Sequence, residues 1–255
     1  MFEPQWINES LTTLQTCYNE KIILKLKNFK KVKVLESIES IQTENPYVYW
    51  FVYKCYFKGH GISVNWDKAF TFLQKALVIT VNPIFLYDSA VMHEFGMGTS
   101  INWDKAHTLY FEALNLNIDN TSLYTGAIYY KLGYLFHKGI GVSADLEKAI
   151  EYYNIGIQYK NYKSAYYCGL IYYNKYEFKI SFTYFETCFI FSKGIFSEVL
   201  YILGKCYEFG FGCKINYEKA SELYAKGSRM NHLECIRNYA DLYLSKKCKF
   251  KFIES

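Results

Sequence analysis

The sequence predicts an all-α fold, an α-solenoid of about five antiparallel helix pairs with capping helices at its ends. A Gly-x-Gly turn recurs four times, and each copy has an acid-Lys-Ala triplet whose lysine follows the first glycine by nine residues. The first glycines are 37, 43 and 71 residues apart, so the last interval has room for a further, degenerate copy. A period of this length is typical of stacked helix pairs. The turn glycines are Gly59, Gly61, Gly96, Gly98, Gly139, Gly141, Gly210 and Gly212.

The first helix of each repeat precedes the turn. Fifteen residues before the lysine lies a residue that is small in three of four copies, and we call this the reference position: Tyr53, Ala90, Gly133 and Gly204. A small side chain there lets two helices approach closely. In the third copy the first helix is predicted over about residues 127–138, because Gly139 can adopt the left-handed conformation that ends helices. The second glycine then lets the backbone reverse.

The second helix of each repeat begins after an Asn or Asp that can cap it. The capping residues are Asn65, Asn102, Asp145 and Asn216, and the acid that follows lies in the first turn, where the helix dipole favours negative charge. Four residues beyond each alanine comes a large side chain, and three further comes a small one. Spacings of four and three place these residues on one packing face: Leu73, Tyr110, Tyr153 and Tyr224, with Ala76, Ala113, Gly156 and Gly227.

The degenerate fourth copy keeps Gly169, Tyr172, Tyr184 and a small Thr187, but it lacks the Gly-x-Gly turn. Only ten residues separate Gly169 from Lys179, so the solenoid is expected to kink or tighten there. Polar residues 117–122 predict a lengthened loop. The predicted organisation is an N-terminal helical cap over residues 1–45, repeats over 47–82, 84–120, 127–161, 163–192 and 197–230, a partial repeat over 231–245, and a basic tail over 246–255.

The third copy carries a family resemblance. Tyr130-Lys131-Leu132-Gly133, Gly139-Ile140-Gly141-Val142, Asp145, Lys148-Ala149 and Tyr152-Tyr153 together resemble the Sel-one-like repeat, a relative of the tetratricopeptide repeat with a longer, glycine-marked turn. The resemblance covers about residues 47–245, with departures at Tyr53 and in the fourth copy. It implies a right-handed superhelix that holds protein complexes together, as an adaptor or regulatory subunit without catalytic residues.

Charge and composition narrow the classes of partner. The net charge of +5 comes with just two arginines among 29 basic residues, which argues against nucleic acid. Lysines gather in residues 21–33 and 246–251, and these two ends are where contact with an anionic membrane would occur. The start of the chain lacks a signal-peptide pattern and no run is long and apolar enough to span a membrane, so a cytoplasmic location is expected. The eight cysteines are expected to be reduced and mostly buried.

The sequence predicts no catalytic, cofactor-binding or metal-binding residues and no small-molecule substrate. The glycine pairs follow helices and lack the spacing of a phosphate-binding loop, so we interpret them as structural turns. One set of possible zinc ligands, Cys206, Cys213, His232 and Cys235, has no Cys-x-x-Cys pair, and buried thiols with a surface imidazole are the preferred interpretation. The remaining histidines occur singly, which is unlike a catalytic grouping.

An aromatic residue lies three residues before the reference position in all five copies: Trp50, Tyr87, Tyr130, Tyr166 and Tyr201. Two interpretations are open. These rings can wedge between adjacent helices, or their edges can line the concave face of the solenoid. Positions four and seven residues further along share their helical face. Those residues are Lys54 and Phe57, Val91 and Glu94, Tyr134 and His137, Leu170 and Tyr173, and Lys205 and Glu208.

The leading hypothesis is a non-enzymatic scaffold or adaptor that binds a partner peptide or helix of one or more proteins on the concave face. The candidate protein-binding residues are Trp50, Tyr87, Tyr130, Tyr134, Tyr166, Tyr173, Tyr201 and Lys205. The alternative is a regulatory or activating subunit of a membrane-associated enzyme complex, with the lysines of residues 21–33 on anionic lipid. An enzyme would require a site assembled from scattered His and Cys side chains.

Overall fold

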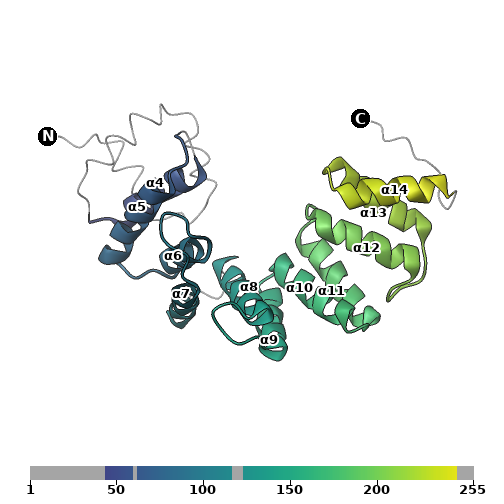
Figure 1. Cartoon of the computed structure of the whole chain (residues 1–255), viewed down its shortest axis with the longest axis horizontal. Coiled ribbons are helices and arrows are strands. Elements are labelled where there is room, and N and C mark those ends of the chain that lie inside the picture. The colour runs from purple at the N-terminus through teal and green to yellow at the C-terminus, as the bar shows by residue number, and fades with distance from the viewer. Residues whose placement is uncertain (1–43, 60–61, 117–122, 246–255) are drawn as a thin grey trace. The chain divides into compact units, whose positions relative to one another are not determined.

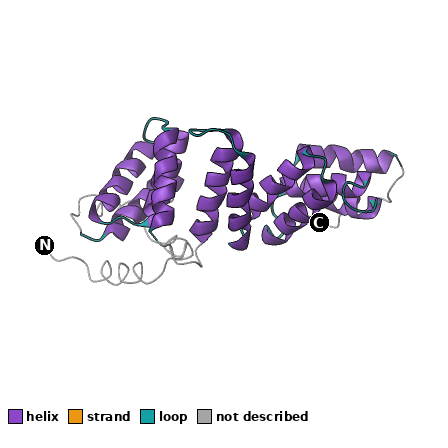
Figure 2. Cartoon of the chain, turned by 90° about the horizontal axis from the view of Figure 1, so that it is seen from below, coloured by secondary structure: helices purple, strands orange, loops and turns teal. Residues whose placement is uncertain are grey.

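The computed structural model describes residues 44–59, 62–116 and 123–245, and these form helices without strands (Figures 1 and 2). The chain divides into two compact units, Met1–Asp119 and Asn120–Ser255. The N-terminal cap, the loop of residues 117–122, Gly61 and the basic tail lie outside the described residues, apart from Glu44 and Asn45 of the cap. Among the described residues, no helix combines the length and the apolar character needed to cross a membrane.

The described residues of the first unit form two helix pairs. They are α4 (Pro46–Lys58) with α5 (Trp66–Ile79), and α6 (Pro83–Phe95) with α7 (Trp103–Asn115). Each helix packs on the next one along the chain, so the second helix of one repeat contacts the first helix of the following repeat.

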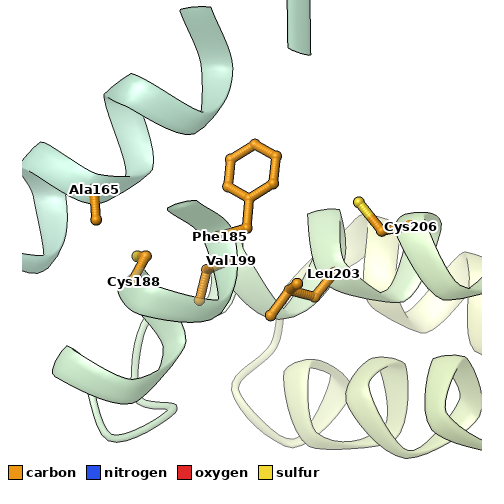
Figure 3. Close-up of a cluster of buried hydrophobic side chains, with 6 residues drawn as sticks. All are labelled: Ala165, Phe185, Cys188, Val199, Leu203 and Cys206. Carbon is orange, nitrogen blue, oxygen red and sulfur yellow. The ribbon is translucent and has the colours of Figure 1, made fainter. Parts of the chain in front are cut away.

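In the second unit, residues 123–245 form three helix pairs and one further helix. They are α8 (Leu123–Lys138) with α9 (Leu146–Gln158), α10 (Tyr162–Asn174) with α11 (Phe178–Phe191), α12 (Ser197–Phe209) with α13 (Tyr217–Arg229), and α14 (Leu233–Leu244). Consecutive helices pack together, and first helices also contact each other, α8 with α10 and α12 with α14. Helix α8 begins four residues before the predicted start. A buried cluster joins α10, α11 and α12 (Figure 3): Ala165, Phe185, Cys188, Val199, Leu203 and Cys206.

The predicted turns and caps are confirmed in the described residues. The first glycine after a first helix has the left-handed conformation, with φ between 65° and 77° at Gly59, Gly96, Gly139 and Gly210. The expected residue caps each second helix: the Lys68 backbone N–H donates to Asn65 Oδ1 at 2.9 Å, and the Lys105 N–H donates to Asn102 Oδ1 at 2.8 Å. Asp145 and Asn216 accept equivalent bonds from the Lys148 and Lys219 backbone N–H groups.

The second glycine of the turn has a further packing role that the sequence did not indicate. Gly98 and Gly212 also have positive φ, 68° and 77°. A β-carbon on Gly98 would overlap the backbone carbonyl of Trp66, and one on Gly212 would overlap that of Phe178. Both carbonyls belong to the first residue of the preceding repeat's second helix. The glycine therefore lets one repeat lie directly on the backbone of the one before.

A glycine at the reference position leaves room for the large side chain of the second helix. A β-carbon on Gly133 would come within 2.6 Å of the Tyr153 ring, and one on Gly204 would come within 2.4 Å of the Tyr224 ring. The first repeat reverses the sizes, because a buried Tyr53 occupies the reference position and Leu73 takes the place of the tyrosine. The departure at Tyr53 is therefore an exchange of volume between two facing positions.

In the fourth repeat, the packing residues of the second helix lie one position later in the sequence than we predicted. Its buried packing residues are Ser181, Phe185 and Cys188, where Tyr184 and Thr187 had been expected, and both of those are only half-buried. Gly169 lies against the Phe185 ring, and the Ser181 hydroxyl donates to the Gly169 carbonyl at 2.9 Å. The error arose because this copy lacks the Lys-Ala pair that marks the register elsewhere. Three residues, 175–177, link its helices, whereas residues 210–216 link those of the fifth repeat.

Candidate protein-binding surface

In four of the five copies, the aromatic residue three positions before the reference position packs on the second helix of its own repeat. Ring centroids are 5.8 Å apart for Tyr87 and Tyr110, and 6.4 Å apart for Tyr130 and Tyr153. The pairs Tyr166–Phe185 and Tyr201–Tyr224 are 6.1 and 6.5 Å apart. These contacts fit the packing interpretation of the aromatic series.

Most members of the series also reach towards the following repeat. Trp50 stacks on Phe85 of α6 at 6.0 Å, and Tyr130 contacts Tyr167 of α10 at 5.7 Å. Tyr166 meets Phe196 edge-on at 5.0 Å, just before α12 begins. The rings nevertheless remain half-buried, so each keeps an exposed part beside its packing contacts.

In the first unit, Lys54, which shares the helical face of Trp50, belongs to a buried network. Lys54 Nζ lies 2.8 Å from Asp88 Oδ2, and the Trp50 indole N–H donates to the same oxygen at 2.8 Å. Lys54 and Asp88 are only 6% and 4% exposed. The expectation that Lys54 lies on an accessible face was wrong, because its partner on the next repeat's first helix draws it inward.

The residue four positions after the reference position is matched to the second helix. Where the second helix carries tyrosine, this residue is a polar acceptor: the Tyr110 hydroxyl donates to Glu94 Oε2 at 2.6 Å, and the Tyr224 hydroxyl donates to Glu208 Oε2 at 3.0 Å. Tyr153 Oη lies 3.4 Å from Nδ1 of His137. Where the second helix carries Leu73 or Phe185, the matching residues are the aromatic Phe57 and Tyr173.

We did not predict this pairing from the sequence. Because of it, Glu94 does not lie on the predicted binding face. Glu94 is 3% exposed, because it turns to Tyr110, which is fully buried. Burial is the main cause that raises the pKa of the Tyr110 hydroxyl well above its usual value, and the neighbouring Glu94 adds to it. The sequence did contain a signal: each of the three second-helix tyrosines has a polar side chain sixteen residues earlier.

The second unit places several half-buried tyrosines together on α8 and α10. Tyr134 lies 6.2 Å from Tyr130 and 5.4 Å from Tyr167, measured between ring centroids. Lys163 Nζ lies 5.6 Å from the centre of the Tyr130 ring. The Tyr134 ring contacts are thus with half-buried rings, whereas Tyr130 also contacts the buried Tyr153. We call Tyr130, Tyr134, Tyr167 and Lys163 the tyrosine surface.

The remaining candidates of the second unit lie further along its first helices. Tyr173 contacts Phe178 at 5.3 Å and Phe211 of the next turn at 5.9 Å, so it supports the junction between two repeats. Lys205 Nζ lies 5.6 Å from the centre of the Tyr201 ring. Burial raises the pKa of Tyr166 to about 12, so its hydroxyl stays protonated at neutral pH.

The cysteines and the histidine considered as zinc ligands have separate packing roles. The Cys213 thiol donates to the Cys206 carbonyl at 3.3 Å, the Cys235 backbone N–H donates to His232 Nδ1 at 3.4 Å, and Cys235 itself packs on Gly227. Burial raises the pKa of Cys206 to about 12 and that of Cys235 to about 11. Within the described part of the chain, no three His, Cys, Asp or Glu side chains are grouped to hold a metal ion.

Comparison with known proteins agrees with these repeats. The family model of the Sel1 repeat matches residues 54–77, 129–158 and 197–232. A comparison of this chain with curated proteins found no match. Among solved structures, a Sel1 repeat protein from Oxalobacter formigenes is 21% identical, covers 88% of this chain and 90% of its own, and has a TM-score of 0.70.

Two further solved structures share the fold. A protective antigen present in uropathogenic Escherichia coli strains, with an SLR fold, is 16% identical and has a TM-score of 0.65, and the match covers 92% of this chain and 51% of that one. The C-terminal part of a TPR repeat-containing protein from Cytophaga hutchinsonii is 15% identical over 93% of this chain and 81% of its own, with a TM-score of 0.50. The glycine turns, the capped second helices and the family match together show that this chain carries Sel1 repeats in the fold of Sel1-repeat proteins.

Proposed function

We propose that this chain is a protein-binding scaffold that holds a partner peptide or helix on the exposed edges of its first-helix aromatic residues. Proteins built of Sel1 repeats are generally scaffolds for protein–protein interaction. The observation that carries the proposal for this chain is the tyrosine surface on α8 and α10. Half-buried tyrosines already held by neighbouring rings offer a large contact area with little further loss of freedom on binding.

The tyrosine surface suits a segment with aromatic or aliphatic anchors. Tyr134 and Tyr167 meet edge-on, with an angle of 74° between their rings, and such an arrangement presents both a ring face and a ring edge. Lys163 adds a positive charge next to Tyr130. We therefore expect apolar anchor side chains on the partner, together with a carboxylate or carbonyl group near Lys163.

The experiment compares two tyrosine-to-alanine variants as bait for proteins of the source cell, quantified by mass spectrometry. Tyr134→Ala removes a ring that packs on half-buried neighbours, so the fold is expected to survive. Tyr152→Ala on α9 is the matched control, because Tyr152 is half-buried by Tyr129 and Phe136. Truncating a central tyrosine that acts as a binding hot spot costs about 2 kcal/mol or more, which weakens binding by roughly thirtyfold. A partner lost with Tyr134→Ala and kept by Tyr152→Ala supports the proposal, and partners kept by both folded variants contradict it.

A further inference from the structure

Three of the five aromatic residues that precede the reference position have a lysine of this chain over their rings. A cation within about 6 Å of the centre of an aromatic ring is attracted by the electrons of the ring. The distances from the lysine Nζ to the ring centre are 5.1 Å for Lys54 and Trp50, 5.6 Å for Lys163 and Tyr130, and 5.6 Å for Lys205 and Tyr201. Binding of a cation is thus a recurring property of this position.

Within the described part of the chain, the ring of Tyr166 has no such cation, and a carboxylate occupies the place of the lysine. Lys163 lies six positions before the reference residue of α10 and reaches back to Tyr130 on α8. The same position of α12 is Glu198, and both side chains are exposed. The junction of the third and fourth repeats therefore has its own ammonium group, whereas the junction of the fourth and fifth repeats has a negative charge.

The Glu198 carboxylate lies beside two half-buried tyrosine rings of α10. It belongs to the first turn of α12, two residues after Phe196, whose ring meets Tyr166 edge-on at 5.0 Å. The rings of Tyr166 and Tyr167 are 5.5 Å apart at an angle of 83°, so they form a corner. Burial raises the pKa of both tyrosines, and the negative charge of Glu198 adds to this effect. The carboxylate and the corner thus belong to one site.

The chemistry of this site favours a guanidinium group. Among the described residues, the Glu198 carboxylate accepts a hydrogen bond from the Ser197 hydroxyl at 3.1 Å and has no basic partner. A guanidinium group is planar, so it can lie against an aromatic ring while its N–H groups donate to a carboxylate. The ammonium group of lysine is a compact point charge and lacks this combination. We therefore expect arginine as the cation that this site binds.

We propose that the partner segment carries an arginine whose guanidinium group lies against Tyr166 and Tyr167 and pairs with Glu198. This inference rests on the proposed function, because Tyr167 is part of the tyrosine surface. Ring contacts of 5.4 and 5.5 Å join Tyr134 through Tyr167 to Tyr166, a span that about three residues of extended chain cover. The arginine therefore lies about three residues from the apolar side chain that the partner places on Tyr134.

The probe is a phage-displayed library of random peptides of about 12 residues, which reach about 40 Å when extended, selected on the immobilised full chain. Arginine near an aromatic or aliphatic residue should recur in the selected peptides. Selection on Glu198→Lys should give an acidic residue in place of the arginine, whereas Glu218→Lys should select the same peptides as the wild-type chain. Glu218 is the matched control, because it is an exposed carboxylate in the first turn of α13. Arginine peptides selected equally by Glu198→Lys would overturn the inference.

The affinity of one selected peptide tests the contact with Glu198 directly. The peptide is synthesised with arginine or with citrulline, which has nearly the same shape without the charge, and is measured by fluorescence anisotropy. Glu198→Gln should weaken binding of the arginine peptide by about fivefold, the upper end for an exposed ion pair, and leave that of the citrulline peptide unchanged. Equal losses for both peptides, or no loss for either, would contradict the proposed pair. Circular dichroism checks that each variant keeps its helices.

Dependence on Tyr134 separates this inference from the proposed function. Selected peptides that lose affinity for Tyr134→Ala but carry no arginine would overturn the arginine site and leave the proposed function standing. If the library gives no peptide whose binding depends on Tyr134, both proposals fail.

Discussion

Replacing each of the three second-helix tyrosines with phenylalanine should destabilise the protein by graded amounts. The Tyr110 hydroxyl donates at 2.6 Å to Glu94, and both side chains are buried. Losing a hydrogen bond to a charged acceptor costs about 1.5–3 kcal/mol, and a buried acceptor places Tyr110→Phe in the upper part of that range. Glu208 is half-exposed and lies 3.0 Å from Tyr224, so Tyr224→Phe should cost about 1 kcal/mol. The long contact of Tyr153 with His137 predicts less than about 0.5 kcal/mol for Tyr153→Phe.

Urea unfolding with two probes can measure this series. All four tryptophans lie in the first 119 residues, so tryptophan fluorescence reports on the first unit, which contains Tyr110. Circular dichroism follows the helices of both units and detects the effect of Tyr153→Phe and Tyr224→Phe. Equal costs at the three positions, or the largest cost at Tyr153, would refute the hydrogen-bond explanation.

A rescue variant tests the same reasoning from the other side. Glu94→Leu combined with Tyr110→Phe should recover most of the stability lost in Tyr110→Phe, because an apolar pair no longer buries an acceptor without its donor. The first repeat already has an apolar pair, Phe57 with Leu73, at these two positions. A double variant less stable than either single variant would show that the pair is held by shape rather than by the hydrogen bond.

Three further outcomes follow from the packing. Gly212→Ala should lower the melting temperature more than Gly210→Ala, because its β-carbon would overlap the Phe178 backbone in addition to the strain of positive φ, and differential scanning fluorimetry can compare them. Asp88→Ala should cost the first unit about 3–5 kcal/mol in urea unfolding, because it leaves the Lys54 charge buried. Burial, with Lys105 nearby, lowers the pKa of His93 below 6.5, so the unfolded chain binds its proton first. Stability should therefore fall as the pH drops below about 6.5, and less so in His93→Leu, as tryptophan fluorescence in urea at pH 7 and pH 5 would show.

The sequence predicts the parts of this fold that depend on local chemistry. Glycines with positive φ and asparagine caps such as Asn65 act through bonds within a few residues, so their spacing alone identifies them. The burial of Lys54 depends on Asp88, which lies 34 positions later in the sequence. The way two repeats stack brings these two residues together. The register of Phe185 was missed for a related reason, since Ser181 replaces the alanine that marks it elsewhere.

The candidate surface was predictable as a set of positions but not as a surface. The aromatic residue before the reference position recurs in every repeat, and its role in packing depends on which ring lies opposite it. Tyr134 and Tyr167 come together only when α8 and α10 lie side by side. Sequence periodicity cannot show this meeting, because the position of Tyr167 is not aromatic in the repeats on either side, where Lys131 and Ile202 occupy it.

Each helix pair of the second unit has a different combination of facing side chains on its first and second helix. Along this unit the residue four positions after the reference position changes from His137 to Tyr173 to Glu208, and the facing side chain changes from tyrosine to phenylalanine and back. If a second helix packed on the first helix of a neighbouring repeat, Glu208 would face Phe185 and Tyr173 would face a tyrosine hydroxyl. Such a shift removes the hydrogen bond between the Tyr224 hydroxyl and Glu208, at about 1 kcal/mol. Near-identical repeats would otherwise be free to exchange partners during folding, so this alternation favours the native pairing over a shift by one repeat.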